Sequence, residues 1–305
     1  MRSCVIGEDG ENVRLDVYLT QMEPDFSRTF VKDWILEGKV LVNGQKVKPH
    51  YKLKPEDELQ WETLIQEKKG LEPEDIPLTI LHEDDDLIVV DKPAGMVVHP
   101  GAGNEFHTLV HALLHHCGEL SEVSALRPGI VHRLDKDTSG VMVAAKNNKA
   151  HFSLAKQFKQ HTIERRYIAL VEGLISFDEG VVDVPIKRHV VDRKKMSVSF
   201  AEDAKEANTF YRVLKRYQDY TALELFPQTG RTHQLRVHLS YLGHPILGDP
   251  VYGRKKNFPR LALHAKDLGF EHPTTKEFMK FSSPLPEDLK KATPDINLEA
   301  PRKKQ

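Results

Sequence analysis

Apolar side chains recur at helical spacing near the start of the chain and in short strand-like runs over most of the remainder. Leu15, Tyr18 and Leu19 follow the i, i+3, i+4 spacing of an amphipathic helix, and residues 1–12 before them read as a polar lead-in. A second stripe predicts another helix, with Ser27 as its N-cap; the stripe consists of Phe30, Val31, Trp34 and Ile35. Two helices are therefore expected before residue 38.

The next segment predicts a small sheet. Asn43-Gly44 lies between the apolar run Val40–Val42 and the start of a second strand at Gln45–Val47, which is a strong signal for a tight hairpin. Residues 58–61 predict a further strand. Residues 64–77 are polar, acidic and contain two prolines, so we interpret them as a linker.

The longer remainder contains many predicted strands and few helices. Apolar runs predict strands at 78–81, 87–90, 141–145, 167–171, 181–186, 196–200, 209–213, 222–226, 261–264 and 278–281. Helical patterns cover 107–116, 148–159 and 232–242, with Phe152 among the side chains available for packing. Too few helices separate the strands for a doubly wound sheet, so we expect an α+β fold with a large, mostly antiparallel sheet.

These patterns divide the chain into a small domain at 12–63, a linker at 64–77, a large domain at 78–290 and a polar tail at 291–305. The Pro- and Lys-rich residues after Pro284 are expected to fray.

Composition narrows the class of protein. The chain has 305 residues, of which 39% are hydrophobic and 29% charged, and no apolar run reaches membrane-spanning length. No signal peptide opens the sequence, so we expect a cytoplasmic protein. Cys4 and Cys117 are too few for a disulfide framework. A net charge of −1 argues mildly against nucleic acid, although basic clusters at 46–54, 187–195 and 254–260 remain compatible with it.

The densest chemistry lies in residues 129–140, GIVHRLDKDTSG. Apolar runs on both sides predict strands that flank a loop, and the loop gathers carboxylates, cations and hydroxyls. Taken alone, the stretch is typical of a charged surface hairpin.

Other stretches change that interpretation. HRLDKDTSG at 132–140 resembles the active-site motif of the RluA/RluD family of RNA pseudouridine synthases. Three more stretches match family motifs in the family's order along the chain: DKPAGM at 91–96, before this motif, and RYIALVEG at 166–173 and GRTHQLRVH at 230–238, after it. Residues 75–283 resemble that family's catalytic domain. The first part of the chain resembles the S4-like RNA-binding domain of the RluD branch.

The resemblance implies roles for individual residues. Asp135 matches the catalytic aspartate, Arg236 its basic partner, Tyr167 the active-site tyrosine, and Arg133 a residue that fills the space left by an extruded base. An arginine close to a carboxylate favours its charged form. The chemistry needs neither a metal nor another cofactor.

Weaker expectations concern neighbouring positions. We interpret His132, Thr138 and Ser139 as loop-shaping, Asp137 as a turn acceptor, and Lys92 and His99 as bordering an RNA groove. In the S4-like part, three cations match positions that face RNA: Arg28, Lys32 and Lys39.

Two alternatives remain open. His111 and His115 are spaced i, i+4 and could bind zinc, although Ala112 replaces the glutamate of the zinc-protease motif. The fold could instead serve a non-catalytic RNA-binding factor in ribosome assembly. We expect an isomerase that converts specific uridines of structured RNA, most simply 23S ribosomal RNA or a large-subunit precursor, and that acts as a monomer away from membranes. The sequence leaves open whether Asp135 attacks C1′ or removes the C2′ proton.

Overall fold

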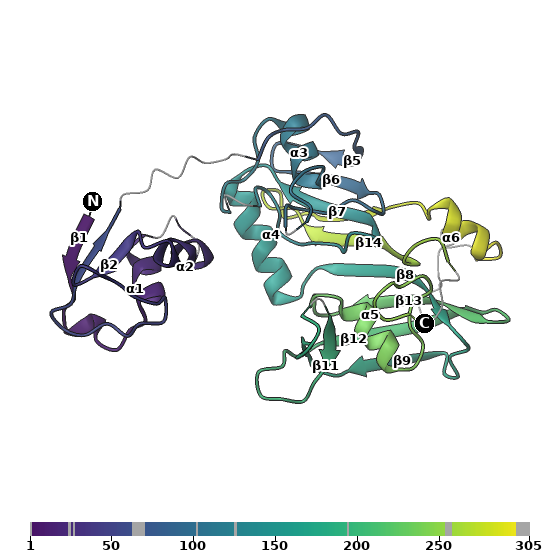
Figure 1. The fold of residues 1–305 in the computed structure, drawn as a ribbon. Helices are drawn as coiled ribbons and strands as arrows, with labels where there is room; N and C mark the ends of the chain where they lie inside the picture. The colour runs from purple at the N-terminus through teal and green to yellow at the C-terminus, as the bar shows by residue number, and fades with distance from the viewer. Residues whose placement is uncertain are drawn as a thin grey trace. The chain divides into compact units, whose positions relative to one another are not determined.

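The computed structural model describes residues 2–23, 26, 28–62, 71–101, 103–124, 127–193, 195–253 and 258–296. Within it the chain forms two compact units, 1–69 and 70–305 (Figure 1). Each unit has its own hydrophobic core, so each is described separately.

The first unit combines two helices with a four-stranded sheet of order β1-β4-β2-β3. Its elements are β1 (Arg2–Val5), the short 3-10 helix η1 (Glu8–Gly10), α1 (Leu15–Met22), α2 (Arg28–Leu36), β2 (Val40–Val42), β3 (Gln45–Lys46) and β4 (Glu58–Trp61). Asn43 and Gly44 both have positive φ, 52° and 72°, as the predicted hairpin turn requires. The two helices and the strands at 40–42 and 58–61 are confirmed, whereas Ser27 lies outside the described residues.

The polar lead-in prediction was wrong. Residues 2–5 form strand β1, which pairs antiparallel with all four residues of β4. Its side chains are mostly exposed, so the hydrophobic pattern did not reveal this strand.

The second unit contains a nine-stranded sheet of order β5-β6-β7-β14-β8-β13-β12-β9, with β15 paired to β14. The strands are β5 (Thr79–Glu83), β6 (Leu87–Lys92), β7 (Ser139–Ala145), β8 (Glu164–Glu172), β9 (Glu179–Asp183), β12 (Asn208–Arg216), β13 (Tyr220–Pro227), β14 (Leu263–Glu271) and β15 (Phe278–Ser282). A separate hairpin comprises β10 (Ile186–Arg188) and β11 (Met196–Val198). β14 runs parallel to β7, whereas the other neighbouring strands described in the sheet are antiparallel. The α+β prediction is confirmed.

The close approach of β7 to β14 explains why residue 140 is a glycine. Gly140 has φ 118°, and a Cβ there would lie 2.1 Å from the carbonyl oxygen of Ala265. Only glycine permits both the backbone angle and the contact. The turn that carries Asp135 is thus joined to the middle of the sheet.

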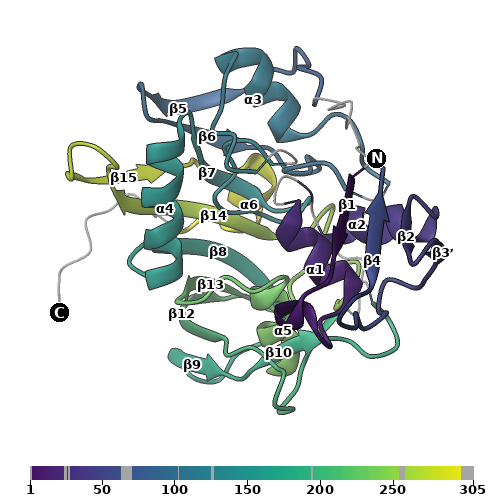
Figure 2. The same cartoon turned by 90° about the vertical axis from the view of Figure 1, so that its left-hand side faces the viewer.

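Four helices pack around this sheet: α3 (Leu109–Cys117), α4 (Asn148–Gln160), α5 (Gln234–Tyr241) and α6 (Glu287–Ala292). Figure 2 shows α4 lying across the sheet. The side chain of Asn147 caps this helix, and its Leu154 packs with Val141 and Val143 of β7. Phe152 on the same helix is 63% exposed, so its predicted packing role was wrong. It lies on the solvent side of α4, two residues before Leu154.

Two further expectations need correction. Ile130 makes only an isolated bridge to Ala144, so one side of the 132–138 loop is irregular chain rather than a strand. Residues 287–292 form α6 with Leu289 fully buried, so the chain after Pro284 is ordered rather than frayed up to that point.

The predicted linker is only partly described. Residues 64–70 lie outside the described residues, and Glu74 already contacts the region of α3 through its backbone N–H to His111 O at 3.1 Å. None of the described helices is long and apolar enough to cross a membrane.

Candidate active site

The second unit holds a pocket of about 590 Å³, built from the 132–138 loop, the start of β8, and the loop between β13 and α5. Its described lining includes six cationic side chains and one carboxylate: Arg127, Arg133, Lys159, Arg165, Arg231, Arg236 and Asp135. A pocket with this excess of positive charge suits a polyanionic ligand.

Asp135 lies at the end of the irregular chain that precedes β7. Its neighbour Leu134 is 5% exposed and packs into the core, which anchors the loop. The turn after Asp135 is closed by the N–H of Thr138, which donates to the Asp135 carbonyl at 3.1 Å. Asp137 was expected to accept at this turn, but the backbone carbonyl of Asp135 has that role.

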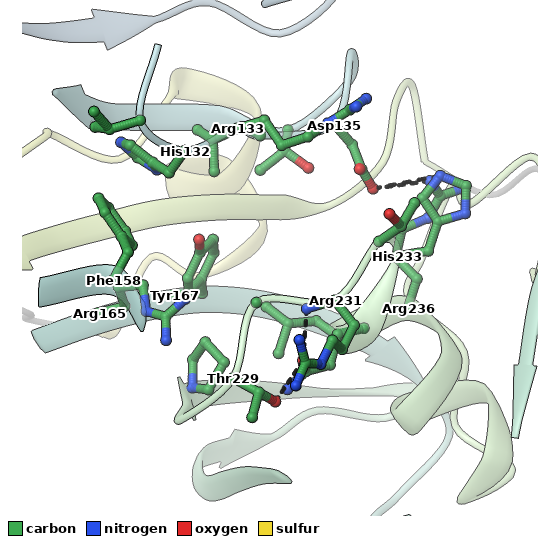
Figure 3. A pocket seen from close by; sticks show the side chains of 18 of the residues that line it. His132, Arg133, Asp135, Phe158, Arg165, Tyr167, Thr229, Arg231, His233 and Arg236 are labelled. Carbon is green, nitrogen blue, oxygen red and sulfur yellow. Dashed lines mark hydrogen bonds and ion pairs between the residues drawn. The ribbon is translucent and has the colours of Figure 1, made fainter. Parts of the chain in front are cut away.

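Arg236 connects the carboxylate to the opposite wall. Its Nη1 donates to Asp135 Oδ2 at 3.0 Å, and both residues are labelled in Figure 3. Its Nε and Nη2 donate to the two oxygens of Asp249 at 2.8 Å each. Asp135 and Arg236, 101 residues apart, are thus brought together as predicted. A guanidinium fixed on one edge by a bidentate carboxylate presents its remaining N–H in a fixed direction.

The three charges reinforce one another. Burial lowers the pKa of Arg236, but hydrogen bonds to Asp249 and the charge of Asp135 more than offset burial, so the pKa is raised overall. Burial likewise raises the pKa of Asp249, and the hydrogen bonds from Arg236 outweigh it, leaving that pKa below its usual range. Asp249 and Arg236 are therefore a permanently charged pair beside Asp135 at neutral pH.

Asp249 was missed from the sequence. One signal was available: a guanidinium has two usable edges, and Asp135 can occupy only one of them. A second carboxylate near Arg236 was therefore to be expected, and Gly248-Asp249-Pro250 places one in a turn next to a buried run.

Tyr167 lies on β8 and lines the pocket, as the resemblance implied (Figure 3). Burial raises the pKa of its hydroxyl; the charge of Arg165 lowers it and that of Asp135 raises it. The hydroxyl is therefore protonated at neutral pH. Arg133 is exposed at the rim of the pocket.

Two histidines that line the pocket, His132 and His99, have different surroundings. His132 accepts from the N–H of Val143 at 3.1 Å and stacks on Phe158, and burial followed by the charge of Arg165 lowers its pKa to about 3. It shapes the loop as a neutral acceptor, as expected. His99 lines the pocket, and burial, aided by Arg127, lowers its pKa to about 4.

The prediction for Lys92 was wrong. Its side chain is fully buried, and its Nζ donates to the carbonyls of Pro93, Met96 and Lys136. It holds two loops together and does not border a groove. The reason is local: β6 ends at Lys92 and points this residue inward below the Asp135 turn.

Gln234 fixes the loop between β13 and α5. Its Oε1 accepts from Thr229 and from the N–H of Arg231, and its Nε2 donates to Asn208 O and Thr209 Oγ1. Four hydrogen bonds from one buried amide hold this wall of the pocket in place.

The proposed zinc histidines have other partners. His111 Nδ1 bonds to Thr108 in the capping box of α3, and His115 lies 3.7 Å from Asp75. Among the described residues, no group of three or more metal-ligating side chains is placed to hold an ion.

The predicted cations of the first unit gather around one carboxylate. Asp16 is fully buried and accepts from Arg14 at 3.0 Å and Arg28 at 3.1 Å, with Lys32 Nζ at 3.9 Å. Arg28 and Lys32 remain 48% and 43% exposed. Lys39 pairs with Glu37 instead.

Comparison with known proteins gives matches over both units. The model of the RNA pseudouridylate synthase family matches residues 86–241, and the S4 domain model matches residues 13–59.

Individual proteins are similar over most of their length. The chain is 47% identical to a Bacillus subtilis protein named uncharacterized RNA pseudouridine synthase YlyB, over 92% of this chain and 93% of that protein. It is 42% identical to the ribosomal large subunit pseudouridine synthase D of Xanthomonas campestris, over 95% of this chain and 91% of that protein. The structure of human RNA pseudouridylate synthase domain containing 1 superposes with a TM-score of 0.58, at 29% identity, over 69% of this chain and 84% of that one.

Proposed function

The chain belongs to the RNA pseudouridylate synthase family and is a pseudouridine synthase with an S4 domain. We propose that it isomerises specific uridines of 23S ribosomal RNA. Several relatives at 42–46% identity are named ribosomal large subunit pseudouridine synthase D. The free large-subunit RNA or a precursor of that subunit is the proposed partner.

One observation supports the chemistry most directly: Asp135 is the single carboxylate among the described residues that line a cationic pocket, and Arg236 donates to only one of its oxygens. Nη1 of Arg236 is bonded to Oδ2. Oδ1 makes no hydrogen bond to a described residue, which leaves it available to react. A carboxylate that is ion-paired to a fixed arginine through one oxygen, with its other oxygen facing the pocket, is suited to act as a nucleophile or base.

The reaction is an isomerisation and needs no oxidant or reductant. The N1–C1′ bond of uridine breaks, the uracil rotates, a C5–C1′ bond forms, the proton on C5 is lost and N1 gains a proton. Asp135 assists the first bond cleavage, either by attack on C1′ or by removal of the C2′ proton. Both routes use the free oxygen Oδ1.

Tyr167 and Arg133 complete the proposed site. The ring of Tyr167 offers a surface on which the uracil can stack, and its protonated hydroxyl can exchange a proton near C5. Arg133, exposed at the rim, is placed to occupy the space of the flipped base, which offsets part of an unstacking cost of a few kcal/mol.

Arg28, Lys32 and Lys39 of the first unit are proposed to contact RNA phosphates. Arg28 and Lys32 converge on the buried carboxylate of Asp16, which fixes their positions while leaving both partly exposed. Because the carboxylate, its arginine and the pocket come from one chain, we propose that the protein acts as a monomer, in the cytoplasm where ribosomal RNA is made.

Asp135→Asn tests the proposal. The change is nearly isosteric but removes the charge, so release of tritium from RNA labelled at uridine C5 should fall at least about 1,000-fold. Binding of the same RNA should stay within a few-fold. Asp137→Asn, two residues further along the same turn, is the matched control and should keep most of the activity.

The outcomes separate two functions. Comparable tritium release by Asp135→Asn and wild type would remove Asp135 from the mechanism. If the wild type binds ribosomal RNA tightly but forms no pseudouridine in it, the non-catalytic assembly factor becomes the better description. Mapping of pseudouridines in ribosomal RNA from cells with and without the gene identifies the target uridines.

A further inference from the structure

His233 has an unusual backbone for its position. It precedes the first residue of α5 with φ 54° and ψ 19°, the left-handed region that a non-glycine residue seldom adopts. Such conformations cost on the order of 1 kcal/mol and cluster at functional sites. The side chain of His233 lines the pocket and points toward Asp135 (Figure 3). The distance from His233 Nε2 to Asp135 Oδ2 is 3.9 Å.

A neighbouring tyrosine determines which nitrogen of His233 carries the proton. The backbone N–H of Met196 donates to Tyr252 Oη at 2.8 Å, so this oxygen already serves as an acceptor. Tyr252 Oη is 3.0 Å from His233 Nδ1. The phenol has one proton to donate, and Nδ1 is placed to accept it. The ring of His233 then carries its proton on Nε2, the nitrogen that faces Asp135.

Tyr252 is itself fixed by the charged pair of the site. Its backbone N–H donates to Asp249 at 3.0 Å, and the guanidinium of Arg236 lies over its ring, 5.2 Å from the centroid. The orientation of His233 is therefore set by the same residues that hold Arg236.

The ring of His233 is uncharged at neutral pH. The groups that face it are Asp135 and Asp249, which are negative, and Arg236 and Arg133, which are positive. Burial lowers the pKa of His233, Asp135 opposes this, and Arg236 adds to it, so that the pKa lies below its ordinary value. A neutral ring with its proton on Nε2 is a hydrogen-bond donor of fixed direction.

We propose that His233 is a positioning residue for Asp135, and that Tyr252 fixes its tautomer. The proposal rests on the proposed function of this site. In the present structure 3.9 Å is longer than a hydrogen bond, but a side-chain shift of about 1 Å brings Nε2–H into range, and catalytic hydrogen bonds commonly shorten when substrate binds. Arg236 Nη1 and His233 Nε2 then both hold Oδ2, and Oδ1 is directed at the ribose.

The tautomer is measurable without RNA. In protein labelled with ¹⁵N, the two ring nitrogens have different shifts when protonated and unprotonated, and the His233→Asn spectrum identifies the signals of His233. We expect an unprotonated Nδ1 and a protonated Nε2 at pH 7 and in the full-length chain. The opposite tautomer, or a doubly protonated ring, overturns the proposal.

Kinetics test the role. Asparagine tolerates the left-handed backbone and can accept from Tyr252, but it is too short to reach Asp135, so His233→Asn should lower the single-turnover rate roughly 10- to 100-fold. His233→Gln places an amide N–H near the position of Nε2 and should recover most of the rate. RNA affinity should change little in either variant. A wild-type rate in His233→Asn, or a His233→Gln rate no higher than that of His233→Asn, overturns the proposal.

Tyr252→Phe separates positioning from packing. The variant keeps the ring under Arg236 but loses the hydroxyl, so His233 should populate both tautomers and the rate should fall about 5- to 10-fold. Tyr220→Phe is the matched control: its hydroxyl donates to Ala292 O, away from the pocket, and its loss should leave both the rate and the His233 signals unchanged. An unaltered His233 spectrum in Tyr252→Phe overturns the role given to Tyr252. If the wild type makes no pseudouridine in any RNA, the proposed function fails, and the tautomer measurement still decides the state of His233.

Discussion

Lys92 shows how one buried side chain supports the loop that carries Asp135. Its Nζ donates to Pro93 O at 2.7 Å, Met96 O at 2.9 Å and Lys136 O at 3.2 Å, and Lys136 directly follows Asp135. Three carbonyl acceptors match the three N–H groups of an ammonium. Burial opposes that charge and lowers the pKa of Lys92 to about 7, although the negative charges of Asp137 and Asp135 act in the opposite direction.

This lowered pKa predicts a dependence of stability on pH. The folded pKa of about 7 lies below the ordinary value of 10.5, so between these values the unfolded chain holds more protons at Lys92 than the folded chain does. The free energy of unfolding should therefore rise with pH in this window, by up to about 1.4 kcal/mol per pH unit from this group. Below pH 7 both states are protonated and the contribution is constant.

Lys92→Met tests both the hydrogen bonds and the charge. At pH 7 the variant should lose about 3 kcal/mol of unfolding free energy, because three buried carbonyls lose their donor. Between pH 8 and 9.5 its stability should rise less steeply than that of the wild type. Urea unfolding at several pH values measures both, with the exposed Lys149→Met as control. Equal slopes in variant and wild type would show that Lys92 stays fully charged, held by its three acceptors.

At the scale of single residues, sequence motifs located Asp135, Arg236 and Tyr167, because these side chains lie in stretches with a distinctive order of residue types. They did not locate Asp249 or assign a role to His233 and Tyr252. Those roles depend on which edge of a guanidinium is free and which nitrogen of an imidazole faces a carboxylate, and both are fixed by packing between distant segments.

Among the elements, helix α6 braces the turn that carries Asp135. Arg260 donates through Nε and Nη2 to the carboxylate of Asp288 on α6, at 2.6 and 3.0 Å. Its Nη1 faces the carbonyls of Leu261 at 2.9 Å and Asp137 at 3.5 Å. Leu289, the next residue along α6, is fully buried in a core cluster of the second unit. The helix therefore connects the core to the turn that carries Asp135.

Leu289→Ala should destabilise the second unit by about 3 kcal/mol, as a large-to-small change in a packed core does. Leu174→Ala, at a position 49% exposed, is the control and should cost less than about 1 kcal/mol. Urea unfolding of both variants gives the comparison. A Leu289→Ala variant no weaker than the control would mean that α6 contributes little to the core.

Helix α6 also shows which helices and strands a hydrophobic pattern in the sequence cannot predict. Its six residues contain one buried apolar side chain, too few for a periodic signal. Strands such as β7, in which all seven residues are buried, were predicted with nearly correct bounds because their apolar runs are continuous. β1 depends instead on backbone pairing with the distant strand β4 and has mostly exposed side chains, so its own residues carry no hydrophobic pattern. The apolar pair Ile130-Val131 misled in the opposite direction, because it makes only an isolated bridge to Ala144.

For the whole molecule, the first and second units have separate cores. The buried residues of the first unit, from Ile6 to Trp61, pack with one another. The sheet of the second unit packs with other core clusters, whose buried residues all lie at position 87 or later in the chain. The predicted domain bounds of 12–63 and 78–290 remain a proposal, and separate cores support it because each unit buries its own apolar surface.

Deletion of residues 1–64 is the decisive change at this scale. The remaining chain retains every described residue of the proposed active site, so it should fold cooperatively and convert a short RNA with a single-turnover rate within a few-fold of the full chain. Its affinity for long ribosomal RNA should fall, because the proposed phosphate contacts of Arg28, Lys32 and Lys39 are lost. The slope of log affinity against log salt should decrease in magnitude by roughly 2, about 0.7 to 0.9 for each phosphate contact removed. Lys32→Met in the full chain, which leaves Arg14 and Arg28 on Asp16, should remove about one such contact without changing the chemical step. A fragment that cannot fold would show that the division into two domains is wrong. A folded fragment with an unchanged salt slope would show that the first unit does not hold RNA phosphates, and the cations around the pocket would then account for binding.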